Sequence, residues 1–357
     1  MVGEGKLEEL AAAATEARAG AVLVDHDITP SQARNIEKAT GAEVLDRTAV
    51  ILAIFQRHAR TREARLQVEI ARLGYLAPRL REGSAGRDRQ SGGIGGRGAG
   101  ESHLELDRRK LRDRIAELRQ ELAAVERDSS TRRSRRADAQ TVALVGYTNA
   151  GKSSLMRALT GSGVLVADQL FATLDTTVRA LYPPAHPRIL VSDTVGFIKK
   201  LPHDLVASFR STLDEARVAS LLLHVIDASD PAHPAQMEVT REVLAEVGAD
   251  DAPRFLVLNK IDRVDEARRA ELAAAHPDAL LLSAKRPEDV ADLRARLVAY
   301  FERDMIEAEV VVPYARQRLV GEIHAQCRVL AETYDEQGTR VRLRTDPATL
   351  ARLRSSL

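Results

Sequence analysis

The chain has 357 residues, of which 44% are apolar and 29% charged, and its net charge is +1. This length allows two or three domains that each bury a core. The one cysteine, Cys327, excludes an intramolecular disulfide, and the lack of a basic leader or a long apolar run argues against secretion and a membrane span. We therefore expect a cytoplasmic protein that acts as a monomer.

The charge is unevenly distributed along the chain. Residues 47–137 contain 22 Lys and Arg but only 12 Asp and Glu, a surplus of +10 that leaves −9 for the rest. Such a segment attracts polyanions, because neutralised phosphates release counterions. A solvated helical face in an arginine-rich composition would give the same count.

The first 60 residues have the pattern of a small α/β domain. Residues 21–25 (AVLVD) and 43–46 (EVLD) read as strands, and Thr29 and Pro30 as the cap and first residue of a helix between them.

Residues 61–137 predict a long antiparallel helical hairpin. The first helix begins near Thr61 and should end at Pro78, since proline interrupts a helix. The second begins near Ser102, and its apolar positions recur at spacings of four and three, which is typical of paired helices. These positions are Leu104, Leu111, Ile115, Leu118, Leu122 and Val125.

Residues 81–101 (REGSAGRDRQSGGIGGRGAGE) form a glycine-rich loop at the hairpin tip. A plain connector needs only a few residues, so a long cationic loop with few side chains favours contact with a phosphate backbone. The residues expected to bind RNA are Arg81, Arg87, Arg89 and Arg97. A disordered connector is the alternative.

From about residue 138 the pattern alternates between strands and helices, which predicts a mostly parallel sheet in a domain over 138–302. The expected strands are residues 141–146, 178–182, 188–193, 220–226, 254–258 and 279–283. Residues 303–357 predict a small α/β domain, with strand-like EVVVP and RVRLRT around a helix from Ala315 to Thr333.

The segment GYTNAGKS, residues 146–153, matches a phosphate-binding loop and lies between a strand and a helix, as that motif requires. Gly146 and Gly151 let backbone N–H groups point at the phosphates. Lys152 adds positive charge there, and the Ser153 hydroxyl is a magnesium ligand.

Two further motifs follow strands. In DTVG, Asp193 is placed to reach magnesium through water, and the Gly196 N–H to reach the γ-phosphate. In NKID, Asp262 can accept both guanine N–H groups, while the Lys260 stem covers base and sugar. Adenine lacks this donor pair, so the sequence predicts a GTPase.

The segment SAK, residues 283–285, follows the next strand. Ser283 and Lys285 should brace the base-binding loop, and the Ala284 N–H should be available to the guanine carbonyl.

Together GYTNAGKSS, ADQLFATLD, DTVGFIKKLPHDLVASF, NKID and SAK resemble the HflX family of translational GTPases. The upstream PSQARNIEKA, LDRTAVILAIFQRHARTREARLQVEIARLGYLAPRL and GGIGGRGAGE do so too. The resemblance spans nearly the whole chain. It implies an N-terminal HflX domain, a hairpin reaching the large ribosomal subunit and its RNA, a Ras-like GTPase domain and a short C-terminal domain. It also implies GTP-dependent ribosome binding and the splitting of stalled ribosomes.

The same resemblance assigns Thr173 as the magnesium ligand of the first switch loop, although Thr176 and Thr177 are hydroxyls of the same loop. Asn149 is similar to an asparagine that related GTPases use to hold K⁺ beside the phosphates, and hydrogen bonding within the loop is the alternative. Phe197 cannot orient water, so intrinsic hydrolysis should be slow.

These expectations define one nucleotide site with GTP or GDP, Mg²⁺ and K⁺ as its ligands. The residues expected to act in hydrolysis are Lys152, Thr173, Gly196 and Asn149. Those expected to contact nucleotide are Gly146, Tyr147, Thr148, Asn149, Ala150, Gly151, Lys152, Ser153, Ser154, Phe171, Ala172, Thr173, Leu174, Asp175, Asp193, Thr194, Val195, Gly196, Asn259, Lys260, Asp262, Ser283, Ala284 and Lys285.

The leading hypothesis is a GTP switch that fixes the basic hairpin on ribosomal RNA and releases it on hydrolysis. The second is an assembly or signalling switch that docks on ribosomes without separating their subunits. A metabolic kinase ranks third, because no second substrate pocket is visible in the sequence.

Overall fold

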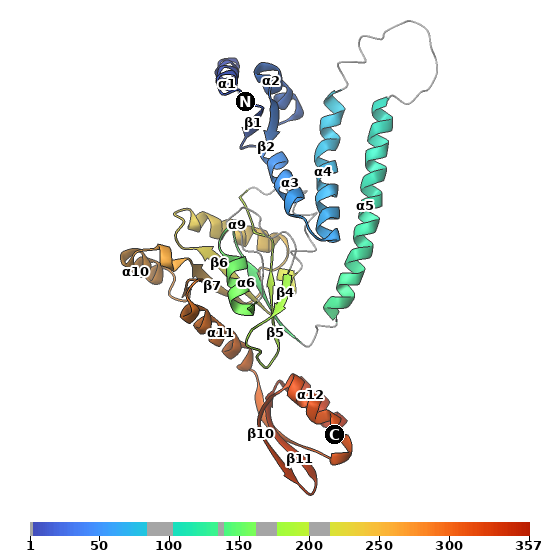
Figure 1. Ribbon diagram of the computed structural model, residues 1–357, viewed down its shortest axis with the longest axis vertical. Coiled ribbons are helices and arrows are strands. Elements are labelled where there is room, and N and C mark those ends of the chain that lie inside the picture. Colours follow the sequence, from blue (N-terminus) through green and yellow to red (C-terminus); the bar gives the residue numbers. More distant parts are fainter. Residues whose placement is uncertain (1–2, 84–102, 135–138, 162–176, 200–214) are drawn as a thin grey trace. The chain divides into compact units, whose positions relative to one another are not determined.

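Strands and helices alternate along most of the chain in the computed structural model (Figure 1). The structure describes residues 3–83, 103–134, 139–161, 177–199 and 215–357. Among these, the residues up to Thr131 form one compact unit and those from Arg132 onward form a second. The domain boundaries expected at residues 60, 137 and 302 stay predictions.

The N-terminal unit begins with a βαβ arrangement. Strands β1 (Ala21–Val24) and β2 (Glu43–Asp46) pair in parallel, and α2 (Pro30–Thr40) connects them. Helix α2 starts there because the Thr29 and Gln32 side chains each accept a backbone N–H of the other residue, a capping box. Two further helices, α1 (Glu4–Glu16) and α3 (Arg47–His58), complete this region. The strands and α2 were predicted, whereas α1 and α3 were not.

Helices α4 (Arg62–Gly83) and α5 (His103–Ser134) lie side by side and antiparallel in Figure 1, as the sequence predicts. Their contact is apolar, and an ion pair between Arg62 and Glu121 adds to it at 3.0 Å. The contact residues are Leu66, Ile70 and Leu118, with Leu73, Ile115, Leu122 and Val125 packed around them. The alternating spacing in the second helix therefore marked its packing face.

The predicted end of the first helix at Pro78 is wrong, because α4 continues through Pro78 to Gly83. Proline inside a helix costs about 3 kcal/mol through a lost hydrogen bond and a steric clash. Contacts on both sides of it offset this cost. Tyr75 Oη donates to Asp46 Oδ1 at 2.8 Å, and the Arg79 guanidinium pairs with the same buried carboxylate.

The second unit contains a six-stranded sheet in the order β4-β5-β3-β6-β7-β8. All neighbouring strands are parallel except β4 and β5, so the predicted mostly parallel sheet is confirmed. The strands are β3 (Gln140–Val145), β4 (Thr177–Ala180), β5 (Ile189–Asp193), β6 (Leu221–Asp227), β7 (Arg254–Asn259) and β8 (Leu280–Leu281).

Helices cover both faces of this sheet. Apolar residues of α6 (Lys152–Thr160) and α11 (Pro287–Glu302) share one core with alternate residues of β3, β5 and β6. The opposite face packs against α9 (His233–Glu246) and α10 (Glu266–Ala275). Burial on both faces explains why the central strands read as continuous apolar runs.

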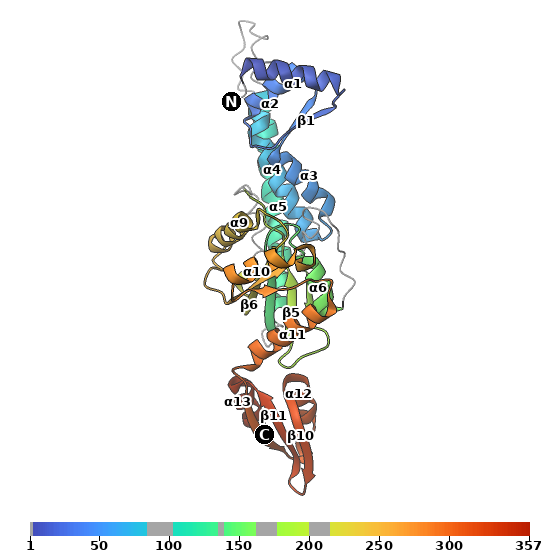
Figure 2. The same cartoon turned by 90° about the vertical axis from the view of Figure 1, so that its left-hand side faces the viewer.

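The C-terminal part of this unit is a three-stranded antiparallel sheet in the order β10-β11-β9. Its strands are β9 (Ile306–Val312), β10 (Arg328–Asp335) and β11 (Gly338–Thr345), and its helices are α12 (Arg318–Gln326) and α13 (Pro347–Ser356). Figure 2 shows both helices against the sheet, where Ile323 and Leu353 share a core with Val341. Cys327 is buried in that core.

The helix predicted from Ala315 to Thr333 is correct only in its middle. Helix α12 ends at Gln326, and β10 begins two residues later. β10 pairs with β11 through the hairpin that ends at Gly338, and this tertiary pairing overrides the helical pattern. None of the helices within the described ranges is long and apolar enough to cross a bilayer.

The buried imidazole of His224 makes stability depend on pH. Its side chain lies in β6 and is 3% exposed, and Nε2 has no hydrogen-bond partner among the described residues. Burial, and then the positive charges of Arg254, Lys152 and Arg241, lower the pKa of His224 to about 4. In the unfolded chain this pKa returns to about 6.5.

Below about pH 6.5 the unfolded chain therefore binds a proton that the folded chain refuses until about pH 4. We expect this residue alone to lower the free energy of unfolding by about 3 kcal/mol across that window. His224→Leu should remove this share of the pH dependence in urea unfolding between pH 7 and pH 4.5. His26→Gln, which changes an exposed histidine, is the control. Parallel curves for the parent and His224→Leu would contradict the prediction.

Candidate functional site

The phosphate-loop sequence folds as the motif predicts, between β3 and α6. The Lys152 side chain turns back under the loop, and its Nζ donates to the carbonyls of Gly146 at 3.0 Å and Tyr147 at 2.9 Å. Burial lowers the pKa of Lys152 to about 8, while the nearby Asp193 acts in the opposite direction. A bound polyanion would favour the charged amine, so the loop is built to receive negative charge.

Gly151 is required by its surroundings. Its φ of 95° is rarely adopted by residues with a side chain, and a Cβ placed there would lie 2.2 Å from Asn259 Nδ2. Asn259 uses that amide to donate to the Ala150 carbonyl at 2.9 Å, and its Oδ1 accepts from the Ala284 N–H at 3.0 Å. One buried side chain from the end of β7 thus connects the phosphate loop to the SAK segment.

Asp193 and Ser153 meet, as the sequence predicts for a magnesium site. The Ser153 hydroxyl donates to Asp193 Oδ2 at 2.7 Å, and the carboxylate is fully buried at the end of β5. A serine hydroxyl and a carboxylate are the oxygen donors that Mg²⁺ prefers. The residues present therefore fit this ion.

The residue directly after DTVG, Phe197, is joined to the phosphate loop by backbone hydrogen bonds. The Thr148 N–H donates to the Phe197 carbonyl at 2.8 Å, and the Phe197 N–H donates to the Gly146 carbonyl at 3.1 Å. A Cβ on Gly196 would lie 2.9 Å from the Thr148 Cα and 3.1 Å from Lys152 Nζ, so only glycine fits without displacement. The Phe197 ring is 1% exposed and belongs to the core.

The remaining residues around this contact differ in where they point. The Tyr147 hydroxyl accepts from the Lys199 N–H at 3.1 Å, while Thr194 Oγ1 turns into the sheet and donates to the Leu144 carbonyl at 2.7 Å. Val195 is buried, and Ser154 is half-buried in the first turn of α6.

The residues expected to recognise the base form a second group on the same edge of the sheet. Ser283 Oγ donates to Asp262 Oδ1 at 2.6 Å and accepts from the Lys285 N–H at 3.2 Å. The hydrogen bond from Ser283 lowers the pKa of Asp262, so this exposed carboxylate is ionised. The Ala284 N–H, expected to be available to a base, instead donates to Asn259.

Several predicted site residues lie outside the described residues, and their roles stay predictions. They are Phe171, Ala172, Thr173, Leu174 and Asp175 of the first switch loop, and Arg87, Arg89 and Arg97 of the hairpin loop. Arg81 lies in the last turn of α4, and the structure does not describe its side chain. Asn149 is exposed at a φ of 62°, and its side chain hydrogen-bonds to no described neighbour in the loop.

Two carboxylates at this edge were missed in the sequence. Asp289, in the first turn of α11, accepts the Ser283 N–H at 2.7 Å and so supports the residue that holds Asp262. Asp227 ends β6 and pairs with Lys260 Nζ at 2.7 Å. Asp227 follows an apolar run just as Asp193 does, which was the available signal, whereas Asp289 carries none.

Three family models cover most of the chain. Residues 1–56 match the N-terminal region of GTP-binding GTPases, residues 58–136 match their middle region, and residues 141–260 match the family described as 50S ribosome-binding GTPase.

Curated relatives described as GTPase HflX match nearly the whole chain. The GTPase HflX of Gluconacetobacter diazotrophicus is 65% identical over 336 residues, which is 94% of this chain and 74% of that protein. The GTPase HflX of Escherichia coli is 43% identical over 95% of this chain and 80% of its own length. The GTPase HflX of Magnetococcus marinus is 44% identical over 99% of this chain and 83% of its own length.

Among solved structures, a GTP-binding protein from Sulfolobus solfataricus in complex with GDP is 26% identical. The match covers 83% of this chain and 86% of that one, at a TM-score of 0.44, which is too low to bear on the fold. The family models and the curated relatives agree with the geometry of the site. In that site the phosphate loop contacts Asp193, and the NKID segment contacts SAK. The chain belongs to the HflX family of GTPases.

Proposed function

We propose that this chain hydrolyses GTP to GDP and phosphate in order to bind the large ribosomal subunit and split stalled or idle ribosomes. The observation that supports the nucleotide half most is the bridge through Asn259. It fixes the phosphate loop and the base-reading loop at one separation, which is what a ligand with phosphates at one end and a purine at the other requires.

At the phosphate end, backbone N–H groups of residues 149–154 and the Lys152 amine would bind the phosphate oxygens. Ser153 would hold Mg²⁺ directly and Asp193 through water, and the ion would neutralise charge on the phosphates. Thr173 would be the further ligand from the first switch loop. The Gly196 N–H would bind the γ-phosphate.

Hydrolysis then needs a water positioned without an amide side chain. The Phe197 ring is buried and can neither donate nor accept a hydrogen bond, so it excludes solvent and does not orient the nucleophile. We therefore infer slow intrinsic turnover and a contribution from a monovalent cation held by the exposed Asn149.

The ribosome half is supported by the charge surplus of residues 47–137 and by the 50S ribosome-binding description of the matched family. RNA is recognised largely through its shape and its phosphates, which suits an arginine-bearing loop at the tip of a rigid helix pair. The GTP-bound switch loops would set the pose of that pair, and hydrolysis would release it. We place this ribosome binding and release in the cytoplasm.

Base selection is tested by Asp262→Asn. An amide cannot accept both guanine N–H groups, but it can donate to the additional carbonyl of xanthine. We expect the affinity for GTP to fall about a hundredfold and that for xanthosine triphosphate to rise, as measured by equilibrium binding with Mg²⁺. Asp265→Asn is the matched control, because Asp265 only caps α10 and asparagine caps equally well. Unchanged GTP binding in Asp262→Asn would exclude this residue from base reading.

The monovalent cation is tested by comparing turnover in potassium and sodium. We expect GTP hydrolysis to be faster in potassium by about tenfold to a hundredfold, since a fixed positive charge stabilises the transition state. Asn149→Ala should abolish the difference between the salts while leaving the rate in sodium nearly unchanged. Equal rates for the parent in both salts would remove the ion from the mechanism.

The ribosome half is tested by sedimentation with large subunits in the presence of GTP, GDP or a nonhydrolysable analogue across a salt series. Replacing Arg87, Arg89 and Arg97 with Ala should weaken binding about tenfold or more at low salt and spare GTP affinity. The matched control removes three arginines of the second unit that each pair with a nearby carboxylate, Arg241, Arg268 and Arg296. Equal loss in both triple variants would leave only a non-specific charge effect.

Subunit separation itself is measured on intact ribosomes by gradient centrifugation. The proposal expects separation that depends on GTP. Binding without separation would instead favour an assembly or signalling switch.

A further inference from the structure

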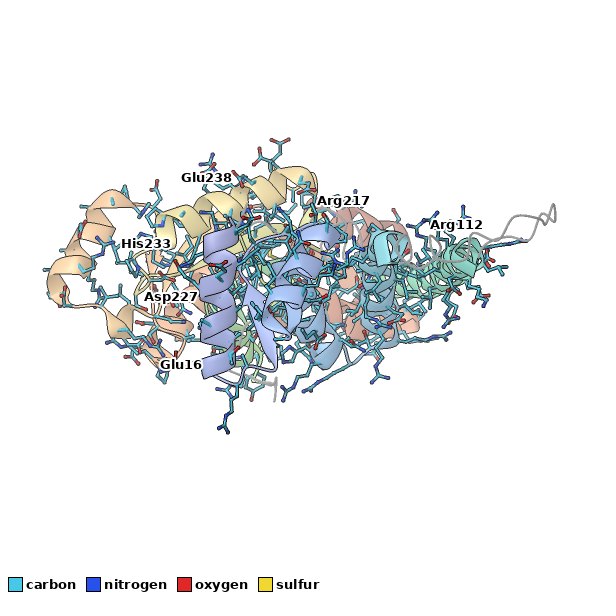
Figure 3. All side chains as sticks on the ribbon, turned by 90° about the horizontal axis from the view of Figure 1, so that it is seen from above. Glu16, Arg112, Arg217, Asp227, His233 and Glu238 are labelled. Atoms are coloured by element: carbon cyan, nitrogen blue, oxygen red, sulfur yellow. The ribbon has the colours of Figure 1, made fainter. Side chains whose placement is uncertain are left out.

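The end of β6 carries an ion pair that the proposed function does not use. Asp227 is the last residue of that strand, whose neighbours β3 and β7 lead into the phosphate loop and NKID. Its Oδ2 lies 2.7 Å from the Nζ of Lys260, the lysine of NKID. Figure 3 labels Asp227, together with His233 at the start of α9.

This pair is well shielded and well oriented. The two side chains are only 14% and 15% exposed, so solvent screens them less than an ordinary surface pair. The other carboxylate oxygen, Asp227 Oδ1, accepts both the N–H and the Oγ–H of Ser229, at 3.0 and 2.6 Å. Ser229 therefore fixes the carboxylate, and the carboxylate in turn fixes the amine.

The ion pair fixes the path of the Lys260 stem across the phosphate loop. The Lys260 backbone has a φ of 62°, a left-handed conformation that is uncommon for a residue with a long side chain. A Cβ placed on Gly151 would lie 3.9 Å from Lys260 Cε, so the stem crosses the phosphate loop on its way to Asp227. A free lysine stem samples many rotamers, and this one is anchored at both ends.

We propose that Asp227 is a positioning residue for nucleotide binding, which holds the Lys260 stem over Gly151 as the apolar surface that receives the purine and ribose of GTP. The inference rests on the proposed function, since it assigns a ligand to that same edge of the sheet. Asp227 touches no part of the nucleotide in this scheme and acts only through Lys260. Anchoring the stem before the ligand arrives removes the entropy cost of ordering it on binding.

The test compares the full-length parent with Asp227→Asn. The amide retains the size of the side chain and an oxygen for Ser229 but loses the charge that holds Lys260. We expect release of fluorescently labelled GDP to become about tenfold faster, the cost of one charge-assisted hydrogen bond. The KM for GTP should rise by a similar factor, and kcat should change less than about twofold, since the cleaved bond lies at the other end of the ligand.

Lys260→Met separates positioning from fold stability, because methionine keeps an apolar stem without the amine. In that background Asp227→Asn should accelerate GDP release by less than about twofold, since the residue through which it acts is gone. Glu238→Gln is the control, because it neutralises an exposed carboxylate of α9 that pairs with Arg241. It should leave GDP release unchanged.

Ser229→Ala is a gentler variant that keeps both charges and should fold even if Asp227→Asn does not. It should accelerate GDP release about two- to fivefold, the cost of one neutral hydrogen bond. If GDP release is unchanged in both variants, the proposal is overturned while the proposed function stands. An equal effect of Asp227→Asn with and without Lys260 also overturns it. A parent that fails to bind GTP with Mg²⁺ overturns the proposed function itself.

Discussion

The nucleotide site of the second unit depends on one buried amide, the side chain of Asn259. Asn259 donates to the Ala150 carbonyl and accepts from the Ala284 N–H, and its side chain is 1% exposed. These two hydrogen bonds connect loops that are more than a hundred residues apart in sequence. Parallel strands place the loops at the same edge of the sheet, but only such a cross-connection sets their spacing. Gly151 must lack a side chain because Asn259 occupies the space that a Cβ would need.

Around Asn259 the site contains carboxylates that each accept a hydrogen bond from a serine. Asp193 meets Ser153, Asp262 meets Ser283, and Asp289 in turn accepts the backbone of Ser283. In each case a donor fixes the direction of a carboxylate. Rotamers fixed in advance lose less entropy when a ligand binds, so the arrangement favours tight binding without a large interface.

Much of the fold could be predicted from the sequence because parallel strands buried on both faces give unbroken apolar runs. β3, β5, β6 and β7 all follow this rule, and all of them except β6 lead into a motif that has a chemical reason for its spacing. The two wrong predictions of helix bounds have a common cause. Residues 328–335 became a strand, and α4 passed through Pro78, because tertiary partners decided both outcomes.

Site residues were predictable where they belong to a motif. They were not predictable where they act only by holding another site residue in place. Lys152, Ser153, Asp193 and Asp262 came directly from spacing. Asp289 belongs to no motif, because its importance rests on where the first turn of α11 lies relative to Ser283. Only packing fixes that relation.

Phe197 connects to the phosphate loop through two hydrogen bonds of its backbone and none of its side chain. The main chain of residue 197 supplies both the acceptor for Thr148 and the donor to Gly146. The phosphate loop and residue 197 are therefore linked through the backbone, whatever side chain stands there. The ring itself is buried and anchors this backbone connection in the core, so an apolar residue suits a position that holds two loops together.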